Sequence, residues 1–356
     1  MRRLSIKTLA LSAVLALAAA ACGTEAPGGG GGEGGDGEAQ STLRVGVALD
    51  VGGLGDKSFN DSANRGLEQA ISDGLVSEQN VELLEANQTG SNRDDNMQNL
   101  ADQGFELILG IGFAFSEGVA EIAPDYPDQS FGIVDGFATF VNAEATNIAD
   151  LTFKEHEGSY LVGIAAAMAS ESGTIGFLGG QVGTGLIEKF QAGYEAGARS
   201  VNPDIEILVE YIGDSTQAFV NPTAGEALSA SMYDGGADIV YHAAGQSGLG
   251  LFKAAVQAEK LAIGVDSDQY LTASPEEQPL ILTSMIKRVD TAVYDSIQQA
   301  VDGSFEGGFR TYGIAEGGIG YSDSNPALTE EMKAAMDQAS DAIVAGEITV
   351  PEEPEA

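Results

Sequence analysis

Three aspartates are the first residues in this sequence whose type and position could do chemistry. Asp50, Asp135 and Asp266 each follow directly after a short apolar run that is typical of a parallel strand. In open α/β sheets, ligands bind beyond the carboxyl ends of the strands, so these side chains are expected to face one region. A carboxylate there accepts hydrogen bonds from hydroxyl or N–H groups of a ligand. The alternative is that each aspartate caps the helix that follows it.

The loop after the first of these apolar runs carries the most specific sequence motif of the chain. Residues 50–60 read Asp-Val-Gly-Gly-Leu-Gly-Asp-Lys-Ser-Phe-Asn. The chain contains no Trp, so any aromatic surface for stacking a flat ligand must come from Phe or Tyr. Composition alone does not say which of these residues would serve. For Phe59 in this loop the alternative is a core residue after a turn, and for Phe219 further along it is an anchor of a loop.

The residues needed for common enzyme chemistry are scarce. His156 and His242 are the only histidines, and Cys22 is the only cysteine, so the sequence predicts neither a soft metal site nor a Cys/His catalytic pair. No Gly-Lys pair is present for a phosphate-binding loop, and Gly183-Thr184-Gly185 lacks the third glycine of a dinucleotide-binding loop. We therefore predict a protein that is not an enzyme and that uses no cofactor or metal.

Short β-rich runs alternate with longer amphipathic stretches, which predicts an α/β fold with parallel sheets. Strands are expected at 43–49, 81–85, 107–110, 131–134 and 147–151, and then at 174–178, 206–211, 239–241, 262–265 and 281–284. Helices are expected near 60–72, 93–103, 116–123, 155–169, 186–199, 224–233, 248–258, 286–301 and 326–345.

The body of the chain is long enough for two hydrophobic cores, since a single core stops growing near 300 residues. We expect one lobe over 42–151 plus about 285–303, and a second over 152–284 plus about 304–346. Two Rossmann-like lobes with parallel sheets, joined by a hinge, resemble the type I periplasmic-binding-protein architecture. The Pro/Glu-rich tail at 347–356 is expected to be disordered.

The charge of the chain limits its partners. Its 54 acidic and 16 basic residues give a formal net charge of -38, spread along the chain rather than gathered in one block. Nucleic acids and anionic lipid headgroups would be repelled by such a surface. We therefore expect no nucleic-acid partner.

The N-terminus has the features of an export signal. Arg2, Arg3 and Lys7 precede an apolar run of about 13 residues, which is shorter than the roughly 20 needed to span a bilayer. We predict a signal peptide at 1–21, with Cys22 carrying a lipid at the extracytoplasmic face of the cell membrane. The alternatives are ordinary secretion and a disulfide between chains. The Gly-rich segment at 22–41 is expected to be a flexible tether.

The motifs of the chain, taken in order, resemble the basic membrane protein family, which consists of lipoproteins that bind nucleosides for ABC importers. The resemblance rests on residues 50–60 and on further matches at Glu157–Gly163, Gln217–Phe219 with Pro222, Gly245–Gly250, Ile263–Gln269 and Thr283–Lys287. Together these motifs cover nearly all of the body from Leu43 to about Gly320.

This resemblance implies a binding site. A purine base would lie between Phe59 and Phe219, with Asp50 and Asn60 at its polar edge and Asp135 close by. Asp266 and Lys287 would bind the ribose hydroxyls, and the backbone near Gly245 would line the same pocket. The resemblance also implies a nucleoside ligand, an ABC permease as partner and a monomer. A receptor for another small polar solute and a nucleoside-processing enzyme are the alternatives.

Overall fold

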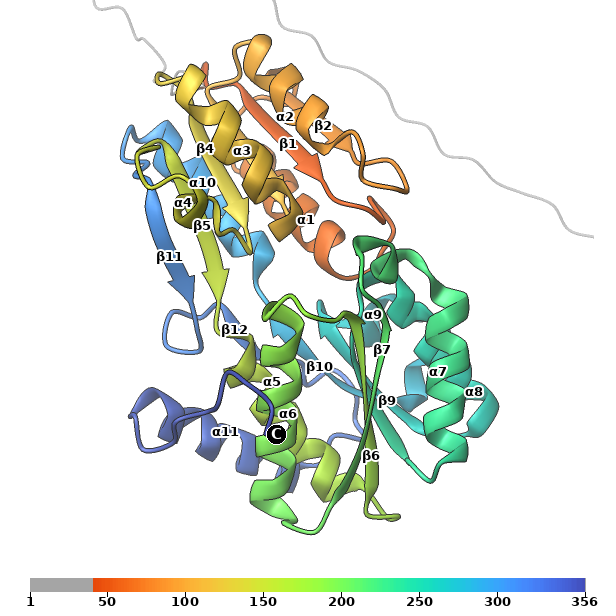
Figure 1. Cartoon of the computed structure of the whole chain (residues 1–356). Coiled ribbons are helices and arrows are strands. Elements are labelled where there is room, and N and C mark those ends of the chain that lie inside the picture. The colour runs from red at the N-terminus through yellow and green to blue at the C-terminus, as the bar shows by residue number, and fades with distance from the viewer. Residues whose placement is uncertain (1–40, 356) are drawn as a thin grey trace, which may run out of the picture. The chain divides into compact units, whose positions relative to one another are not determined.

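The computed structural model describes residues 41–355, which form two α/β lobes, each built on a six-stranded sheet (Figure 1). The first sheet contains β1 (Val45–Leu49), β2 (Val81–Glu85), β3 (Leu107–Ile111), β4 (Ser130–Val134), β5 (Ile148–Phe153) and β11 (Gly308–Tyr312). Their order in space is β11-β5-β4-β3-β1-β2, and every neighbouring pair is parallel. The helices of this lobe are α1 (Phe59–Ser72), α2 (Arg93–Asp102), α3 (Ser116–Ile122), α4 (Ala138–Val141) and α10 (Val289–Val301).

The second sheet contains β6 (Thr174–Gln181), β7 (Glu206–Gly213), β8 (Ile239–Ala243), β9 (Leu261–Asp266), β10 (Ile281–Lys287) and β12 (Ile319–Tyr321). Its order is β12-β10-β9-β8-β6-β7, in which only β12 is antiparallel to its neighbour. The helices are α5 (Glu155–Ala169), α6 (Leu186–Val201), α7 (Pro222–Asp234), α8 (Leu249–Ala258), α9 (Gln269–Thr272) and α11 (Glu330–Val344). The predicted α/β class with two parallel-strand lobes is confirmed.

Strand β1 shows why the central strands read as continuous apolar runs. All five of its residues are buried, because helices cover both faces of the sheet. Successive side chains point to opposite faces, so Val47 joins the core that contains Leu67 of α1, whereas Ala48 joins the core that contains Met97 of α2. These two cores fix the position of the residue that follows the strand, Asp50.

Within the described residues, the chain crosses between the lobes three times, after β5, after β10 and after β11. The prediction that 304–346 belongs entirely to the second lobe is therefore wrong for β11, which pairs with β5 from Gly308 to Tyr312. This strand lies at an edge, and only Tyr312 of its five residues is buried. Because its residues do not form a continuous apolar run, the sequence did not predict it as a buried strand. The part of the chain that returns to the first lobe after β10 therefore extends beyond residue 303.

The prediction of a disordered tail is wrong for residues 347–355. Val350 is 7% exposed and belongs to the hydrophobic core that also contains Ile343 of α11, and Glu352 lies 3.5 Å from Lys189 of α6. Glu352 is largely exposed, and such ion pairs contribute little, so the apolar contact is the main anchor. The sequence did not predict this contact, because one valine changes the average composition of the Pro/Glu-rich tail very little.

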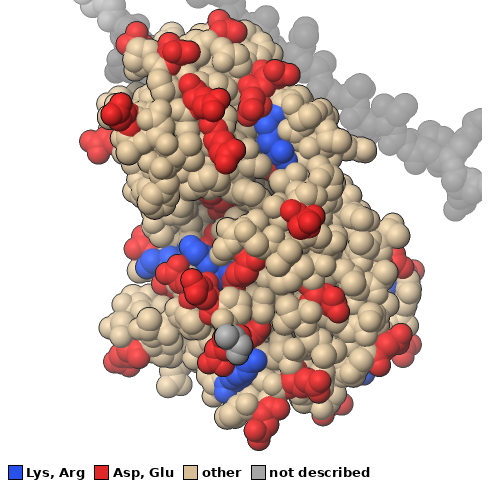
Figure 2. All heavy atoms as spheres, viewed as in Figure 1, with Lys and Arg blue, Asp and Glu red and all other residues tan. Residues whose placement is uncertain are grey.

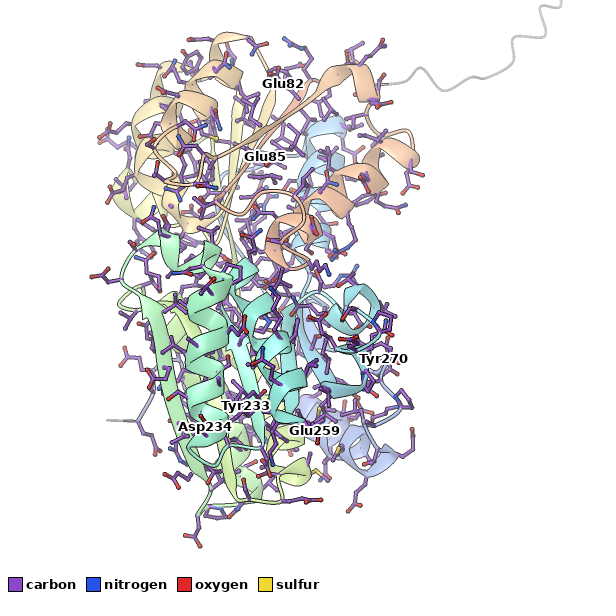
Figure 3. The ribbon with its side chains drawn as sticks, turned by 90° about the vertical axis from the view of Figure 1, so that its right-hand side faces the viewer. Glu82, Glu85, Tyr233, Asp234, Glu259 and Tyr270 are labelled. Carbon is purple, nitrogen blue, oxygen red and sulfur yellow. The ribbon has the colours of Figure 1, made fainter. Side chains whose placement is uncertain are left out.

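Acidic side chains are spread over the visible face of both lobes, with few basic ones among them (Figure 2). At the far end of the second lobe, Tyr233 and Asp234 close α7 and Glu259 follows α8 (Figure 3). The Tyr233 hydroxyl donates a 2.8 Å hydrogen bond to the carbonyl of Leu261, which ties α7 to the start of β9.

Among residues 41–355, no helix has the length and apolar character needed to cross a bilayer. The predicted signal peptide, Cys22 and the tether as far as residue 40 lie outside the described residues.

Candidate functional site

A cavity lies between the two lobes, at the carboxyl ends of strands from both sheets. The space between its walls, including the solvent in its open mouth, is about 640 Å³. All of the residues predicted to bind a ligand line this one cavity: Asp50, Phe59, Asn60, Asp135, Phe219, Gly245, Asp266 and Lys287. Their contacts with a ligand stay predictions.

The three strand-end aspartates face this cavity and do not cap helices. The Asp50 carboxylate accepts a 2.6 Å bond from the backbone N–H of Val51 but none from α1. Asp135 pairs with Lys287, and Asp266 accepts a bond from the Ser58 hydroxyl. The capping alternative is therefore wrong for all three.

Asp56 organises the loop that follows β1. Its carboxylate accepts backbone hydrogen bonds from Ser58 (2.9 Å), Asn60 (2.8 Å) and Asp61 (3.1 Å), and so satisfies free N–H groups at the start of α1. Burial raises the pKa of Asp56, while these bonds act in the opposite direction. The loop geometry sets the first turn of α1, which brings Phe59 to the cavity wall.

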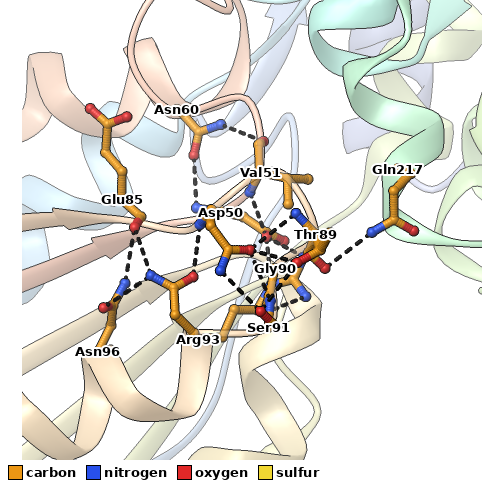
Figure 4. A network of polar contacts seen from close by, with 12 residues as sticks. Asp50, Val51, Asn60, Glu85, Thr89, Gly90, Ser91, Arg93, Asn96 and Gln217 are labelled. Carbon is orange, nitrogen blue, oxygen red and sulfur yellow. Dashed lines mark hydrogen bonds and ion pairs between the residues drawn. The ribbon is translucent and has the colours of Figure 1, made fainter.

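Asn60 uses its side-chain amide within the protein. Its Oδ1 accepts a 3.1 Å bond from the Asp50 backbone N–H, and its Nδ2 donates a 3.0 Å bond to Asp56. A weaker 3.4 Å bond runs from Nδ2 to the Val51 carbonyl (Figure 4). Asn60 therefore lines the cavity but acts first to hold the end of β1 against α1.

Lys287 lies at the centre of a buried charge cluster. It is 1% exposed, and its Nζ lies 2.7 Å from Asp135 and 3.0 Å from Glu155. Burial disfavours its charge, but the carboxylates of Asp135, Glu155 and Asp266 outweigh this effect and raise the pKa of Lys287. Its ammonium also lies 5.3 Å from the ring centre of Phe59, which is within reach of a cation–π interaction.

Two carboxyl groups of this cluster are poised to titrate near neutral pH. Burial raises the pKa of Asp135 to about 6, with Lys287 opposing the shift and Glu155 adding to it. Burial likewise raises the pKa of Asp266 to about 7, opposed by Lys287 and by the hydrogen bond from Ser58. Asp266 has a backbone φ of 63°, a left-handed conformation that aspartate tolerates better than most residues.

The aromatic wall of the cavity comes from both lobes. Phe59 and Phe113 belong to the first lobe, while Phe190 and Phe219 belong to the second. The rings of Phe113 and Phe219 meet edge to face, with centres 6.4 Å apart. Phe219 packs directly on Gly180, where an added Cβ would lie 2.3 Å from the ring, so a glycine is required for Phe219 to take this position.

Several hydrogen bonds join the lobes across the cavity. The Ser267 hydroxyl donates to the carbonyl of Ser58 at 2.9 Å, and Lys57 donates to the carbonyl of Thr272 at 2.9 Å. On another side of the cavity, Gln217 donates a 3.0 Å bond to the carbonyl of Thr89 (Figure 4). These hydrogen bonds hold the two lobes together around the cavity.

Sequence reasoning missed several residues of this region, among them Arg93 and Glu155 as well as Phe113 and Phe190. Arg93 is the first residue of α2, and its guanidinium lies 2.5 Å from the Asp50 carboxylate. A cation is unfavourable at a helix N-terminus, so an arginine there could have indicated a fixed anionic partner. Glu155 is the first residue of α5, a position at which exposed glutamates are common in helices. The sequence therefore does not indicate that it is fully buried.

Comparisons with known proteins agree with this architecture. Residues 43–354 match the family model described as "Bmp: ABC transporter substrate-binding protein PnrA-like". A protein of Listeria monocytogenes named "CD4+ T-cell-stimulating antigen" is 34% identical over 87% of this chain and 88% of its own. The "ABC transporter nucleoside-binding protein BmpA" of Lactococcus lactis is 33% identical over 88% of this chain and 90% of its own.

A solved structure of an ABC transporter solute-binding protein from Aeropyrum pernix has a TM-score of 0.73 and 27% identity, and the match covers 87% of this chain and 94% of that chain. Because the family and these relatives include substrate-binding proteins of transporters, the prediction that the chain is not an enzyme is confirmed. The chain belongs to the Bmp family of PnrA-like ABC transporter substrate-binding proteins.

Proposed function

We propose that this protein captures a nucleoside, preferably a purine nucleoside, between its two lobes and delivers it to an ABC importer. The observation that carries the proposal is one cavity that combines aromatic side chains from both lobes with separate carboxylates, Asp50 and Asp266. Flat bases stack on aromatic rings, and carboxylates accept hydrogen bonds from base N–H and ribose hydroxyl groups. The name of the Lactococcus lactis relative supports the same ligand class.

The proposal predicts that adenosine, guanosine or inosine binds more tightly than free ribose, because only the base can stack on Phe59 and Phe219. Affinities are expected in the nanomolar to low micromolar range, about -8 to -12 kcal/mol. Isothermal titration calorimetry with protein that has been unfolded, dialysed and refolded to remove any retained ligand measures this directly. Ribose that binds as tightly as the nucleosides would contradict the proposal.

A matched pair of phenylalanine variants separates stacking from general damage. Phe59→Ala is expected to weaken nucleoside binding by about 1 to 3 kcal/mol and to change ribose binding little. Phe309→Ala removes a ring that is 47% exposed on β11, outside the cavity, and should leave nucleoside binding unchanged. Equal losses in the two variants would show that Phe59 has no specific role.

We further propose that the mature protein is held at the extracytoplasmic face of the membrane by lipid on Cys22. Support comes from the charged and apolar N-terminal sequence and from the Gly-rich segment that follows Cys22. A single acyl chain binds membranes only marginally, so stable attachment needs more than one chain. Cys22→Ser should move the protein from the membrane fraction to the soluble fraction of the cells. Retention of the variant on membranes would contradict lipid attachment at this residue.

A further inference from the structure

The two carboxylate oxygens of Asp50 have different surroundings. Oδ1 accepts bonds from the Val51 backbone N–H at 2.6 Å and from Arg93 Nε at 2.5 Å, and Arg93 Nη2 also lies 2.5 Å from it (Figure 4). Among the described residues, no group donates a hydrogen bond to Oδ2. Asp50 therefore has one oxygen saturated by the protein and one left as an acceptor.

The open oxygen lies beside Gly112, another residue that lines the cavity. A Cβ added at Gly112 would approach Asp50 Oδ2 to 2.9 Å. Gly112 also has a φ of 130°, which side chains rarely adopt. The glycine thus leaves Oδ2 uncovered, so this oxygen can meet a ligand that enters the cavity.

Arg93 does not line the cavity but is itself held firmly. Its side chain is 12% exposed, and its Nη1 donates a 3.3 Å bond to the carbonyl of Gly90. A Cβ at Gly90 would lie 2.1 Å from Nη1, and Gly90 has a φ of 70°, so the glycine at that position leaves room for the guanidinium where it lies. The preceding loop is fixed by Asn92, whose Oδ1 accepts a 2.7 Å bond from the Asn87 backbone N–H.

We propose that Arg93 is a positioning residue for ligand binding, which holds Asp50 as an ionised acceptor with Oδ2 turned to the cavity. The inference rests on the proposed nucleoside function and assigns Asp50 to an N–H group of the base. A protonated Asp50 would present a hydroxyl on one oxygen, and without the guanidinium the carboxyl group could also rotate. Either change removes the fixed acceptor.

The other charged groups near Asp50 make this role of Arg93 necessary. Glu85 at the end of β2 lies against Gly53 in the same loop, Asp56 lies further along that loop, and Asp135 faces the cavity from β4. These groups are acidic, and the nearby cation Lys287 is paired with Asp135 and Glu155. Burial raises the pKa of Asp50, and Arg93 is the main influence that lowers it.

The test measures inosine binding by calorimetry for the wild type, Arg93→Met, Arg93→Lys, Asp50→Asn and the Arg93→Met/Asp50→Asn double variant. Arg93→Met is expected to weaken binding about 10- to 100-fold near neutral pH, the usual effect of losing a hydrogen bond to a charged group. Without Arg93 the pKa of Asp50 rises further, so Asp50 becomes an ionised acceptor only at higher pH. The loss relative to the wild type should therefore be larger near pH 6 than near pH 8.

Arg93→Lys should recover most of the affinity, because it retains the charge. In the Asp50→Asn background, Arg93→Met should weaken binding little further, since its partner is already neutral. Arg44→Met, at the opposite end of β1, is the matched control for loss of an arginine. If Arg93→Met does not fold, Arg93→Gln and Arg93→Lys provide the same contrast between a neutral and a charged side chain.

The inference is overturned if the loss in Arg93→Met is the same at both pH values and adds fully to that of Asp50→Asn. It is also overturned if Arg93→Met folds and binds inosine as the wild type does. A wild type that binds no purine nucleoside would instead overturn the proposed function itself, so the two failures are distinguishable.

Discussion

Replacement of Lys287 by methionine is expected to lower the free energy of unfolding by about 3 to 5 kcal/mol at neutral pH. The ammonium lies within 3.0 Å of Asp135 and Glu155, and these carboxyl groups, like Lys287, are buried. Methionine fills similar space but leaves the carboxylates without a cation. Because a buried charge without a partner is costly, this is the largest stability effect that we expect from a single substitution in the site.

The effect of Lys287→Met should also depend on pH. Asp135 and Asp266 have folded-state pKa values of about 6 and about 7, above the ordinary value of 3.8. Such groups favour the folded state at low pH, and this contribution is lost as the pH rises through the folded-state pKa. Without Lys287 these pKa values rise further, so the variant should lose more stability near pH 8 than near pH 5.

Denaturant unfolding of the wild type and the variant at the two pH values measures both quantities. The matched control is Lys333→Met, which removes a lysine whose partner Glu330 is 91% exposed, and it should change stability by less than about 1 kcal/mol. A loss in Lys287→Met no greater than in this control, or one that is independent of pH, would show that Lys287 does not neutralise the cluster.

Asp266→Ala is expected to weaken purine nucleoside binding by about 1.5 to 3 kcal/mol near neutral pH. The carboxylate is predicted to accept hydrogen bonds from the ribose hydroxyls, and its loss leaves them without a strong partner. 2′,3′-Dideoxynucleosides should therefore bind the variant about as well as the parent nucleosides do. Since the pKa of Asp266 is about 7, wild-type affinity should rise between about pH 6 and pH 8, and this contribution should be missing in the variant.

Ser58→Ala provides the control for this variant. The Ser58 hydroxyl donates to Asp266 across the two lobes, so Ser58→Ala removes the same bond between lobes but leaves the carboxylate in place. It should retain the difference between nucleosides and dideoxynucleosides, measured by calorimetry. If Asp266→Ala and removal of the two hydroxyls add fully, Asp266 does not contact the ribose and acts only on the closure of the lobes.

The strand pattern was sufficient to predict the three strand-end aspartates of the cavity, because parallel strands place the residues after them at one edge, whereas Phe219, Gly245 and Lys287 were predicted from the family resemblance. Asp50, Asp135 and Asp266 were found in this way, and the continuous apolar runs before them follow from burial on both faces of each sheet. Their hydrogen-bond partners could not be predicted. Whether the Asn60 amide is free or bonded to Asp56 depends on distances between side chains that no pattern of residue types records.

The sequence was least informative where a single contact over a long separation decides the structure. Strand β11 is exposed at alternate positions, and it reads as a loop until its pairing with β5 is known. The placement of the tail likewise depends on one buried residue, Val350, among charged neighbours. Arg93 was missed because its partner Asp50 is 43 residues away in sequence.

The pairing of β11 with β5 also has a consequence for how the chain folds. Thr152 and Thr311, which face each other across this pair, are 159 residues apart, and the whole second sheet except β12 is made between them. Contacts between residues so distant in sequence must close a long loop before they become favourable, and they slow folding. During synthesis from the N-terminus, the first lobe therefore lacks its edge strand, and exposes β5 there, until most of the second lobe has followed it.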